Sequence, residues 1–322
     1  MLHSVEHCTV MHTMTARLAA LWRLARQAVA AWSDDYAPSM GAALAYYTLF
    51  SIAPLLLIVI SVAGLVFGAE AARGEIMGQL RDLMGAEGAR AIQDMLEAAD
   101  KPGQGTVATI VGAIFLLVGA TSVFAELQTA LDRIWRTPAP RSEGVWALLR
   151  KRLLSFGLIM GIGFLLMVSL VASAALAALG KWWGPLFLGW EMLAHALDVV
   201  LGFALTTAAF ALIYKIMPRV RIHWRDVWIG AGVTAGLFTV GRLLIGLYIG
   251  RSGVTSVFGA AASLAVLLVW VYWSAQIFLL GAEFTWVFAH THGSMRDQPM
   301  TDASPLPSRA TTPAGSRSMQ PR

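Results

Sequence analysis

The sequence predicts an all-α integral membrane protein with six transmembrane helices, and three observations lead to this fold class. The chain of 322 residues is 57% hydrophobic and only 13% charged, whereas a soluble domain carries about 25% charged residues. Six stretches are apolar over the roughly 20 residues that cross a bilayer. Lysines and arginines gather in alternate connections between these stretches, as they do in membrane proteins of fixed orientation.

The chain before the first span is expected to lie at the membrane surface. Residues 1–14 carry no helical or strand pattern, and we expect them to be unstructured. Residues 15–35 contain an apolar stripe at helical spacing, formed by Leu18, Trp22, Ala25, Val29 and Trp32. Such a stripe beside arginines predicts an amphipathic interfacial helix on the inner membrane surface. A cytoplasmic helix packed on the bundle would have the same periodicity, and this alternative stays open.

Residues 36–289 form the predicted membrane domain. Its six spans cover approximately 39–68, 106–132, 153–179, 194–217, 227–250 and 257–289. The first and last are longer than a bilayer requires, so we expect tilt or protrusion. The outer loop at 70–104 has two apolar stripes, formed by Ile76, Leu80 and Leu83 and by Ile92, Leu96 and Ala99. These stripes predict two short helices, the second ended by Pro102 and Gly103.

The basic residues predict the orientation. Of the 24 Lys and Arg residues, 17 lie in the N-terminal segment, in the connections after the second and fourth spans, and in the tail. The opposite connections hold six, and Arg242 lies within a span. Because cytoplasmic connections are enriched in Lys and Arg, both termini are predicted to be cytoplasmic. Residues 290–322 are rich in Ser, Thr, Pro and Arg, which predicts a disordered cytoplasmic tail.

The first span carries unusual polar residues for a membrane helix. It begins GAALAYYTLFSIAPLL and contains Tyr46, Tyr47, Ser51 and Pro54. Pro54 has no N–H, so the helix should bend near its middle. Tyr47, Ser51 and Pro54 fall on one helical face, which would be costly against lipid. One interpretation is a proline kink with tyrosines bonded to other helices. The other is a hydrated substrate pocket lined by Tyr46 or Tyr47.

Ionisable residues inside spans are further candidates, because an unpaired charge in a membrane is expensive. Arg242 follows Trp228 by a helical rise of about 21 Å, which places it in the outer half of the bilayer. Asp198, near the outer end of the fourth span, is its predicted partner. The pair is either structural or a site for an anionic group, since guanidinium suits phosphate and carboxylate.

Two glutamates and one helix-end pair lie near the cytoplasmic side. Glu126 and Glu283 stand near the cytoplasmic ends of the second and sixth spans, close to basic connections. They are candidates for ion pairs or, as the alternative, for gating. Asp132 and Arg136 are spaced i, i+4 and are expected to pair with each other.

Pairs of glycines four residues apart predict close contacts between helices. These candidate packing residues are Gly157, Gly161, Gly232, Gly236, Gly246 and Gly250.

No motif in the sequence indicates catalysis. The chain lacks a phosphate-binding GxxxxGK[ST] loop and an HExxH motif, and its single cysteine cannot form an internal disulfide. We find no metal-ligand cluster, so neither a cofactor nor a metal is expected, and no basic surface with interleaved aromatics of the kind that binds nucleic acid.

Four stretches, in order along the chain, resemble the YihY/BrkB family of bacterial inner-membrane proteins. They are GAALAYYTLFSIAPLLL in the first span, GATSVFAELQTALDRIW at 119–135, FALIYKIMPRVRIHWRDVWIGA at 210–231 and LLVWVYWSAQIFLLGAEF at 267–284. Phe258 and Gln276 depart from the family pattern. The resemblance implies a six-helix protein of the bacterial cytoplasmic membrane. Members have carried a ribonuclease BN label and have been linked to serum resistance and envelope lipid traffic.

The leading hypothesis is an inner-membrane transporter or lipid translocator of the cell envelope that hydrolyses no ATP. Its substrate would enter near Tyr47 and Ser51, with Arg242 holding an anionic group. One alternative is a non-catalytic scaffold for an envelope complex, with contacts at 70–104 and 15–32. The inherited ribonuclease activity is the last alternative, and no catalytic set supports it. The expected partners are membrane lipids and a second copy or an envelope-complex protein, but not nucleic acid.

Overall fold

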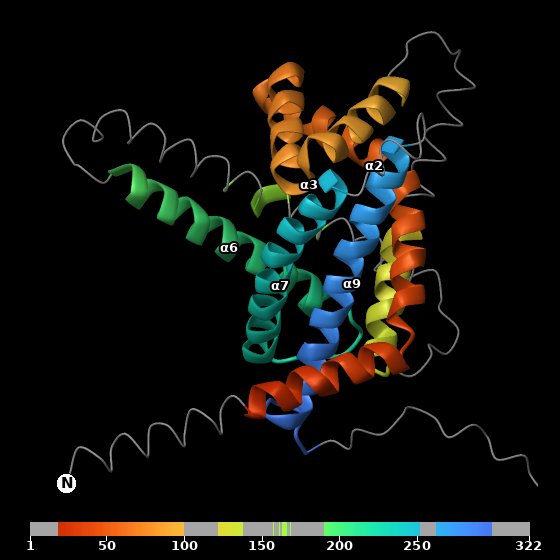
Figure 1. Cartoon of the computed structure of the whole chain (residues 1–322), viewed down its shortest axis with the longest axis vertical. Helices are drawn as coiled ribbons and strands as arrows, with labels where there is room; N and C mark the ends of the chain where they lie inside the picture. The colour runs from red at the N-terminus through yellow and green to blue at the C-terminus, as the bar shows by residue number, and fades with distance from the viewer. Residues whose placement is uncertain are drawn as a thin grey trace, which may run out of the picture.

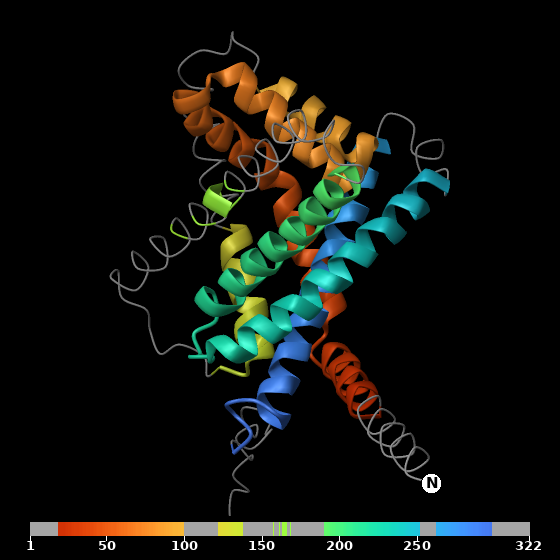
Figure 2. The same cartoon turned by 90° about the vertical axis from the view of Figure 1, so that its left-hand side faces the viewer.

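A computed structural model describes residues 19–99, 122–137, 157, 161, 163–165, 168, 190–251 and 262–297. All regular structure in these residues is helical (Figures 1 and 2). The long helices are α2 (Ala37–Phe67), α3 (Ala69–Ala99), α6 (Trp190–Ile216), α7 (Trp224–Arg251) and α9 (Ala262–Thr291). Two shorter helices cover 19–34, here called the N-terminal helix, and 122–134.

Four predicted spans correspond to long apolar helices. The spans expected at 39–68, 194–217, 227–250 and 257–289 coincide with α2, α6, α7 and α9 to within a few residues. In the described part of the chain, α6, α7 and α9 are each long and apolar enough to cross a membrane, and α2 is a fourth if its two bent parts form one span. The second and third predicted spans lie mostly outside the described residues. The total of six spans and the orientation therefore remain predictions.

Helix α9 occupies the middle of the bundle. It packs against α7 on one side and against α2 on the other, while α6 packs on α7 (Figure 1). This arrangement follows from composition, because α9 has small or apolar residues on several faces. Val266, Leu267, Leu279 and Ala282 are all fully or almost fully buried. Helix α9 therefore connects the α6–α7 side of the bundle with α2.

Helices α7 and α9 approach closely at several glycines, two of which face threonines. A Cβ atom at Gly230 of α7 would collide with the side chain of Thr285 in α9, and a Cβ at Gly281 of α9 would collide with Thr234 of α7. Both threonines are completely buried, and each Oγ1 donates to the carbonyl four residues earlier in its own helix, at 2.8 Å for Thr234 and 2.7 Å for Thr285. Small residues opposite threonines thus set the separation of α7 and α9.

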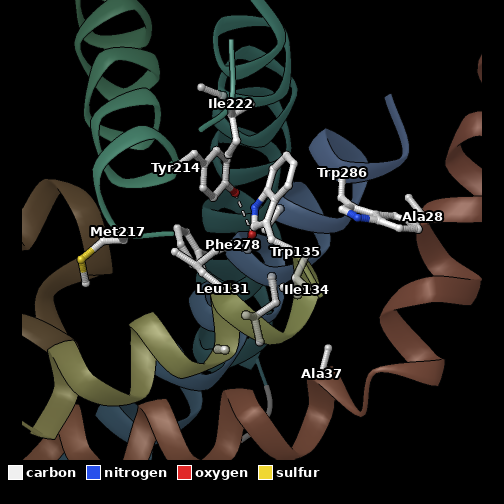
Figure 3. Close-up of a cluster of buried hydrophobic side chains, with 14 of the residues drawn as sticks. Ala28, Ala37, Leu131, Ile134, Trp135, Tyr214, Met217, Ile222, Phe278 and Trp286 are labelled. Carbon is white, nitrogen blue, oxygen red and sulfur yellow. Dashed lines mark hydrogen bonds between the residues drawn. The ribbon is translucent and has the colours of Figure 1, made fainter. Parts of the chain in front are cut away.

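Tyr214 of α6 bonds the same region from a third helix. Its hydroxyl donates to the backbone carbonyl of Phe278 in α9 at 2.7 Å and lies 3.1 Å from Thr234 Oγ1. Figure 3 shows Tyr214 directed into a cluster of buried side chains with Phe278, Leu131 and Trp135. Because Tyr214 is fully buried, its hydroxyl needs these partners, and the contact links α6, α7 and α9.

Helix α3 occupies the predicted outer loop and lies at the opposite end of the bundle from the N-terminal helix (Figure 1). Its helical path breaks at Gly85, which has φ 81° and ψ 174°, a conformation open essentially to glycine alone. The loop thus contains two helical arms, as its two apolar stripes predict. Ile92 and Leu96 are fully buried against Ile60 of α2 and Leu267 of α9. The expected helix end at Pro102 and Gly103 lies outside the described residues.

The N-terminal helix crosses the other end of the bundle (Figure 1). It packs on the core through Leu24, Ala28 and Ala31, which are buried, whereas Trp22 is 71% exposed. Trp22 and Val29, which is also exposed, belong to the predicted apolar stripe. The helix therefore uses one face to hold the bundle and leaves apolar side chains open on another, an arrangement that combines the two interpretations of its periodicity.

The predicted tail is ordered at its start, unlike the prediction for 290–322 as a whole. Helix α9 continues to Thr291, and residues 292–297 turn back toward α7. The backbone N–H and the hydroxyl of Ser294 both donate to Asp226 Oδ2, at 2.9 and 2.6 Å, and Met295 is buried. Residues 1–18 and 298–322, which contain the rest of the predicted terminal segments, lie outside the described residues.

Candidate functional site

The polar residues predicted in the first span lie on α2, near a bend. The helix axis turns by 41° between Ala37–Ala53 and Leu55–Leu65, that is, at Pro54. Tyr46 and Tyr47 are 57% and 37% exposed, and Tyr46 contacts Tyr47 and Phe50 edge-on at ring separations of 5.5 and 5.0 Å. Ser51 is buried, and its hydroxyl donates to the carbonyl of Thr48 at 3.3 Å. The tyrosines and Ser51 therefore occupy different environments on the same helix.

Arg242 and Asp198 lie on the other side of the molecule. Both are exposed, on α7 and α6 respectively. Helix α9 packs between α7 and α2, so the structure does not bring Arg242 next to Tyr47. The two halves of the predicted substrate site are separate surfaces.

Of the predicted packing glycines, Gly161 has a close contact with another helix among the described atoms. No such atom lies within 4 Å of a Cβ built at Gly157, Gly232, Gly236 or Gly246, whereas Gly161 approaches Leu212 of α6. Gly250 lies in the last turn of α7. A packing role for these residues stays a prediction, and the close contact described above uses Gly230 and Gly281 instead.

Of the two candidate glutamates, one is deeply buried. Glu126 is half-buried on the 122–134 helix, whereas Glu283 of α9 is completely inaccessible. A buried ionisable residue within a span is by default a functional candidate. The surroundings of Glu283 are therefore the candidate functional site of this molecule.

Three segments that are distant in the sequence meet around Glu283, and we call this place the acidic junction. The turn after the N-terminal helix contributes Asp35, the turn after the 122–134 helix contributes Arg136, and α9 contributes Glu283 and Trp286. Figure 3 shows the apolar side of this region, where Ala28 of the N-terminal helix lies beside Trp286. The junction thus ties the N-terminal helix to the central helix of the bundle.

Polar atoms in the acidic junction are buried without hydrogen-bond partners among the described residues. These atoms are both carboxylate oxygens of Glu283 and Asp35 Oδ2. The Asp35 and Glu283 carboxyls are nevertheless close enough to bond to each other. Two ionised carboxylates have no hydrogen to share, so the contact becomes a hydrogen bond only if one of them carries a proton.

The charge balance of the acidic junction is uneven. Asp34 and Asp35 repel a charge on Glu283, and Arg136 attracts it. The Arg136 guanidinium also lies over the Trp286 ring, 4.2 Å from its centre, and His290 contacts the same ring at 4.6 Å. Arg136 is therefore a cation that offsets part of the repulsion at Glu283.

The backbone at the acidic junction is strained at two positions. Tyr36, next to Asp35, has φ 57°, and Arg136 has φ 50°. Left-handed conformations cost a residue other than glycine about 1–2 kcal/mol and persist where surrounding contacts hold them. Arg133 supplies one such contact, because its guanidinium lies over the Tyr36 ring at 5.5 Å. Strain of this kind is common at functional sites.

The sequence pointed to Glu283 but not to its surroundings. Asp35 lies in a segment that the sequence predicts to be an interfacial helix. No local sequence pattern connects Asp35 to α9. The expected pair of Asp132 with Arg136 stays a prediction, and the structure gives Asp132 a further partner in Arg219. Asp132 accepts from the backbone N–H of Arg219 at 3.0 Å and pairs with its guanidinium at 3.2 Å. Arg136 lies beyond the helix end with a left-handed backbone.

The chemistry available in the acidic junction is proton and charge chemistry. Within the described ranges, no group of three or more His, Cys, Asp or Glu side chains is arranged to hold a metal ion. Glu283 is fully covered, and Trp135 and Trp286 are 5% and 4% exposed, so a large substrate cannot reach the carboxyl in this conformation.

Comparisons with known proteins give one consistent result. A family model described as virulence factor BrkB matches residues 28–305. A UPF0761 membrane protein of Pseudomonas paraeruginosa strain PA7 is 31% identical over 251 residues, 77% of this chain and 58% of that protein. One from Tolumonas auensis is 28% identical over 256 residues, 79% of this chain and 81% of that protein. The chain thus spans about 58% of the length of the first of these relatives. No solved structure matches.

Proposed function

The chain belongs to the virulence factor BrkB family of bacterial membrane proteins, and within that family we propose that it is a translocator of an anionic lipid or a similar amphiphile. It hydrolyses no nucleotide and is not an enzyme. It resides in the inner membrane with both termini in the cytoplasm, as the distribution of its Lys and Arg residues favours. Membrane lipids, a second copy or an envelope-complex protein are its partners, and nucleic acid is not.

The observation that carries the proposal is the broken span α2. Its first part packs through Ala37, Met40 and Leu44 in the core beside the acidic junction, and its second part packs through Leu56 and Ile60 with α3. The 41° bend at Pro54 lies between these parts. Spans interrupted in the middle of the membrane form the substrate sites of many transporters, because freed backbone groups and polar side chains are available there.

The two tyrosines beside the bend suit a lipid substrate. Tyr46 follows the start of α2 by nine residues, a rise of roughly 14 Å, so its hydroxyl lies near the middle of a hydrocarbon core about 30 Å thick. Aromatic residues that anchor a helix stand at the interface instead. An exposed hydroxyl at this depth costs free energy unless it is bonded. A lipid head group that passes along α2 would supply the partner.

Arg242 is the proposed contact for the anionic part of the substrate. It follows the start of α7 by 18 residues, or roughly 27 Å, and is exposed. Arginine matches phosphate and carboxylate groups through two parallel hydrogen bonds. Since α9 separates Arg242 from Tyr46, the two residues would act at different stages of the passage. Asp198 on α6 would contribute to the Arg242 surface.

A vesicle assay tests the proposal. The full chain is reconstituted into vesicles that contain a trace of phosphatidylglycerol labelled on its acyl chain, and dithionite bleaches the label that reaches the outer leaflet. The protein should make the inner-leaflet label accessible. The double substitution Tyr46→Ala and Tyr47→Ala should slow this movement by roughly tenfold. This corresponds to a free-energy barrier to lipid passage that is higher by about 1.4 kcal/mol.

Tyr248→Ala is the matched control. Tyr248 has the same 57% exposure as Tyr46 but lies three residues before the end of α7, so its loss should leave the rate unchanged. Arg242→Ala should slow a phosphatidylglycerol probe more than an uncharged glycolipid probe. If the wild-type chain moves neither lipid, the translocator proposal fails and a scaffold becomes the better interpretation.

A further inference from the structure

The acidic junction contains a binding site that the proposed transport path does not use. We infer that Asp35 and Glu283 together bind one proton, and that release of this proton separates the N-terminal helix from α9. The proton site stands on the geometry of the acidic junction alone. Only the link between proton release and substrate movement rests on the proposed function.

The first argument is hydrogen-bonding geometry. Glu283 is completely buried, and among the described residues neither of its oxygens accepts a hydrogen bond from a protein donor. The Asp35 carboxyl lies within hydrogen-bonding reach of Glu283, and its Oδ2 is also buried without a donor among the described residues. Two carboxylates at this separation cannot both be ionised at low cost, and a single shared proton turns the contact into a hydrogen bond.

The second argument is a comparison with another buried acid in the chain. Asp226 is 2% exposed, but its Oδ2 accepts two hydrogen bonds from Ser294. It stands in the first turn of α7, where the helix dipole favours a negative charge. Asp226 therefore has hydrogen-bond donors and a helix start beside its carboxyl group. Glu283 has neither the donors nor the helix start.

The third argument is the identity and size of the ligand. The groups that act on Glu283 are Asp34 and Asp35 from the turn before α2 and Arg136 from the end of the 122–134 helix. His290, one turn from Trp286 on α9, faces that ring. Arg133, over the Tyr36 ring, is a second cation near these groups, so three carboxyls stand against two arginines and a further cation is favoured. Because Glu283 is fully covered, a proton is the cation that needs no additional space.

The proton links parts of the chain that are held under strain. Tyr36 and Arg136 keep left-handed backbones on either side of the carboxyl pair. When the proton leaves, two negative charges face each other in a region of low dielectric, and their repulsion pushes the turn at 35–36 away from α9. The strained residues can then relax. A rise in pH should consequently loosen the N-terminal helix, and acid should restore it.

Infrared spectroscopy of the full chain in lipid vesicles tests the proton itself. A protonated carboxyl gives a carbonyl band that disappears as pH rises. Wild-type protein should show such a band at neutral pH, Glu283→Gln should abolish it, and Asp35→Asn should shift its disappearance to lower pH because the repulsion is removed. The matched control, Asp226→Asn, should leave it unchanged. Absence of the band in the wild type, or its persistence in Glu283→Gln, would overturn the proton site.

Thiol labelling tests the separation of the N-terminal helix. In a Cys8→Ser background, Ala28→Cys lies under the helix and Val29→Cys on its open face, since these positions are 2% and 52% exposed. The maleimide labelling rate at position 28 is divided by the rate at position 29. This ratio removes the pH dependence of thiol reactivity from the comparison. This ratio should rise roughly tenfold with pH.

Adding Glu283→Gln should keep the ratio low at every pH, because the amide replaces the protonated acid. A ratio that is constant in the wild type would refute the separation. Neither measurement involves transport. Failure of the vesicle assay would therefore leave the proton result standing, and loss of the infrared band would leave the translocator proposal intact.

Discussion

The two ends of the bundle are held together in different ways. At the junction end, where the N-terminal helix crosses α9, polar side chains connect segments that are distant in the sequence. Asp132 binds Arg219, Asp226 binds Ser294, and Gln128 donates to the Met217 carbonyl at 3.3 Å. At the α3 end, the described cluster is apolar and contains Ile60, Met84, Ile92, Leu96 and Leu267. The hydrogen bonds of Gln79 to Glu75 and of Gln93 to Glu97 join residues only one turn apart.

This difference indicates where the molecule can move. A hydrogen bond specifies distance and angle, whereas apolar burial depends mainly on the area removed from water. The junction end should therefore keep one arrangement, apart from the change controlled by Asp35 and Glu283. The α3 end can shift with little loss. Helix α2 has one part in each region, with its bend between them.

The largest expected effect tests the rigidity of the junction end. Gly230→Leu places a side chain where Thr285 of α9 already lies, so α7 and α9 must separate. The destabilisation should exceed the about 1–3 kcal/mol typical of overpacking, and the protein should not be recovered as a monodisperse species from detergent. Gly232→Leu, two residues away with no described atom near its Cβ, is the control. Equal recovery of the two variants would contradict the close α7–α9 contact.

The next effect should be confined to the α3 end. Leu96→Ala removes a fully buried side chain from the cluster with Ile60 and Leu267, which typically costs about 2–5 kcal/mol. Because this cluster is apolar, α3 should detach while the junction end stays folded. Limited proteolysis by trypsin at Arg81 in α3 should accelerate, and the main thermal transition should change little. If the main thermal transition falls together with faster cleavage at Arg81, the two ends of the bundle are not independent.

A smaller effect is expected from Ser294→Ala. The substitution removes the hydroxyl that donates to Asp226 Oδ2 and leaves the backbone N–H donor in place. Hydrogen bonds to charged groups contribute about 1.5–3 kcal/mol, so the thermal transition in detergent should fall. Trypsin cleavage at Arg81 should stay at the wild-type rate. Faster cleavage there would mean that the junction end also controls α3.

The smallest effect is expected from Tyr214→Phe. The variant keeps the ring in the buried cluster and loses only the bond to the Phe278 carbonyl and the contact with Thr234. A neutral hydrogen bond contributes about 1 kcal/mol. Thr234 still donates to the Gly230 carbonyl, so its buried hydroxyl keeps a hydrogen-bond partner. A thermal shift larger than that of Ser294→Ala would reverse the order proposed here.

The sequence predicts the helices well because hydropathy and length are local properties. Helices α2, α6, α7 and α9 begin and end close to the expected residues, and both arms of α3 follow its two apolar stripes. The choice among glycines was beyond reach, since Gly230 and Gly232 have the same local sequence signal. Only the position of Thr285 on a second helix decides which of them makes the close contact.

The candidate site was predictable only in part for the same reason. An acid within a span draws attention to Glu283, but its proximity to Asp35 depends on how the N-terminal helix crosses α9. The bend of α2 was predictable from Pro54, because the missing N–H is a property of the residue itself. The separation of Arg242 from Tyr47 was not, because it depends on α9 lying between two other helices.

The connection at 217–223 has a consequence for how the protein is made. It reverses the chain between α6 and α7, and it has hydrogen bonds with Gln128, Asp132 and Lys215, which donates to the Ile222 carbonyl. All three residues precede α9 in the chain. The α6–α7 hairpin can therefore close while α9 is still in the ribosome, and the two helices can enter the bilayer as one unit. Helix α9 would then insert beside a surface that is already assembled.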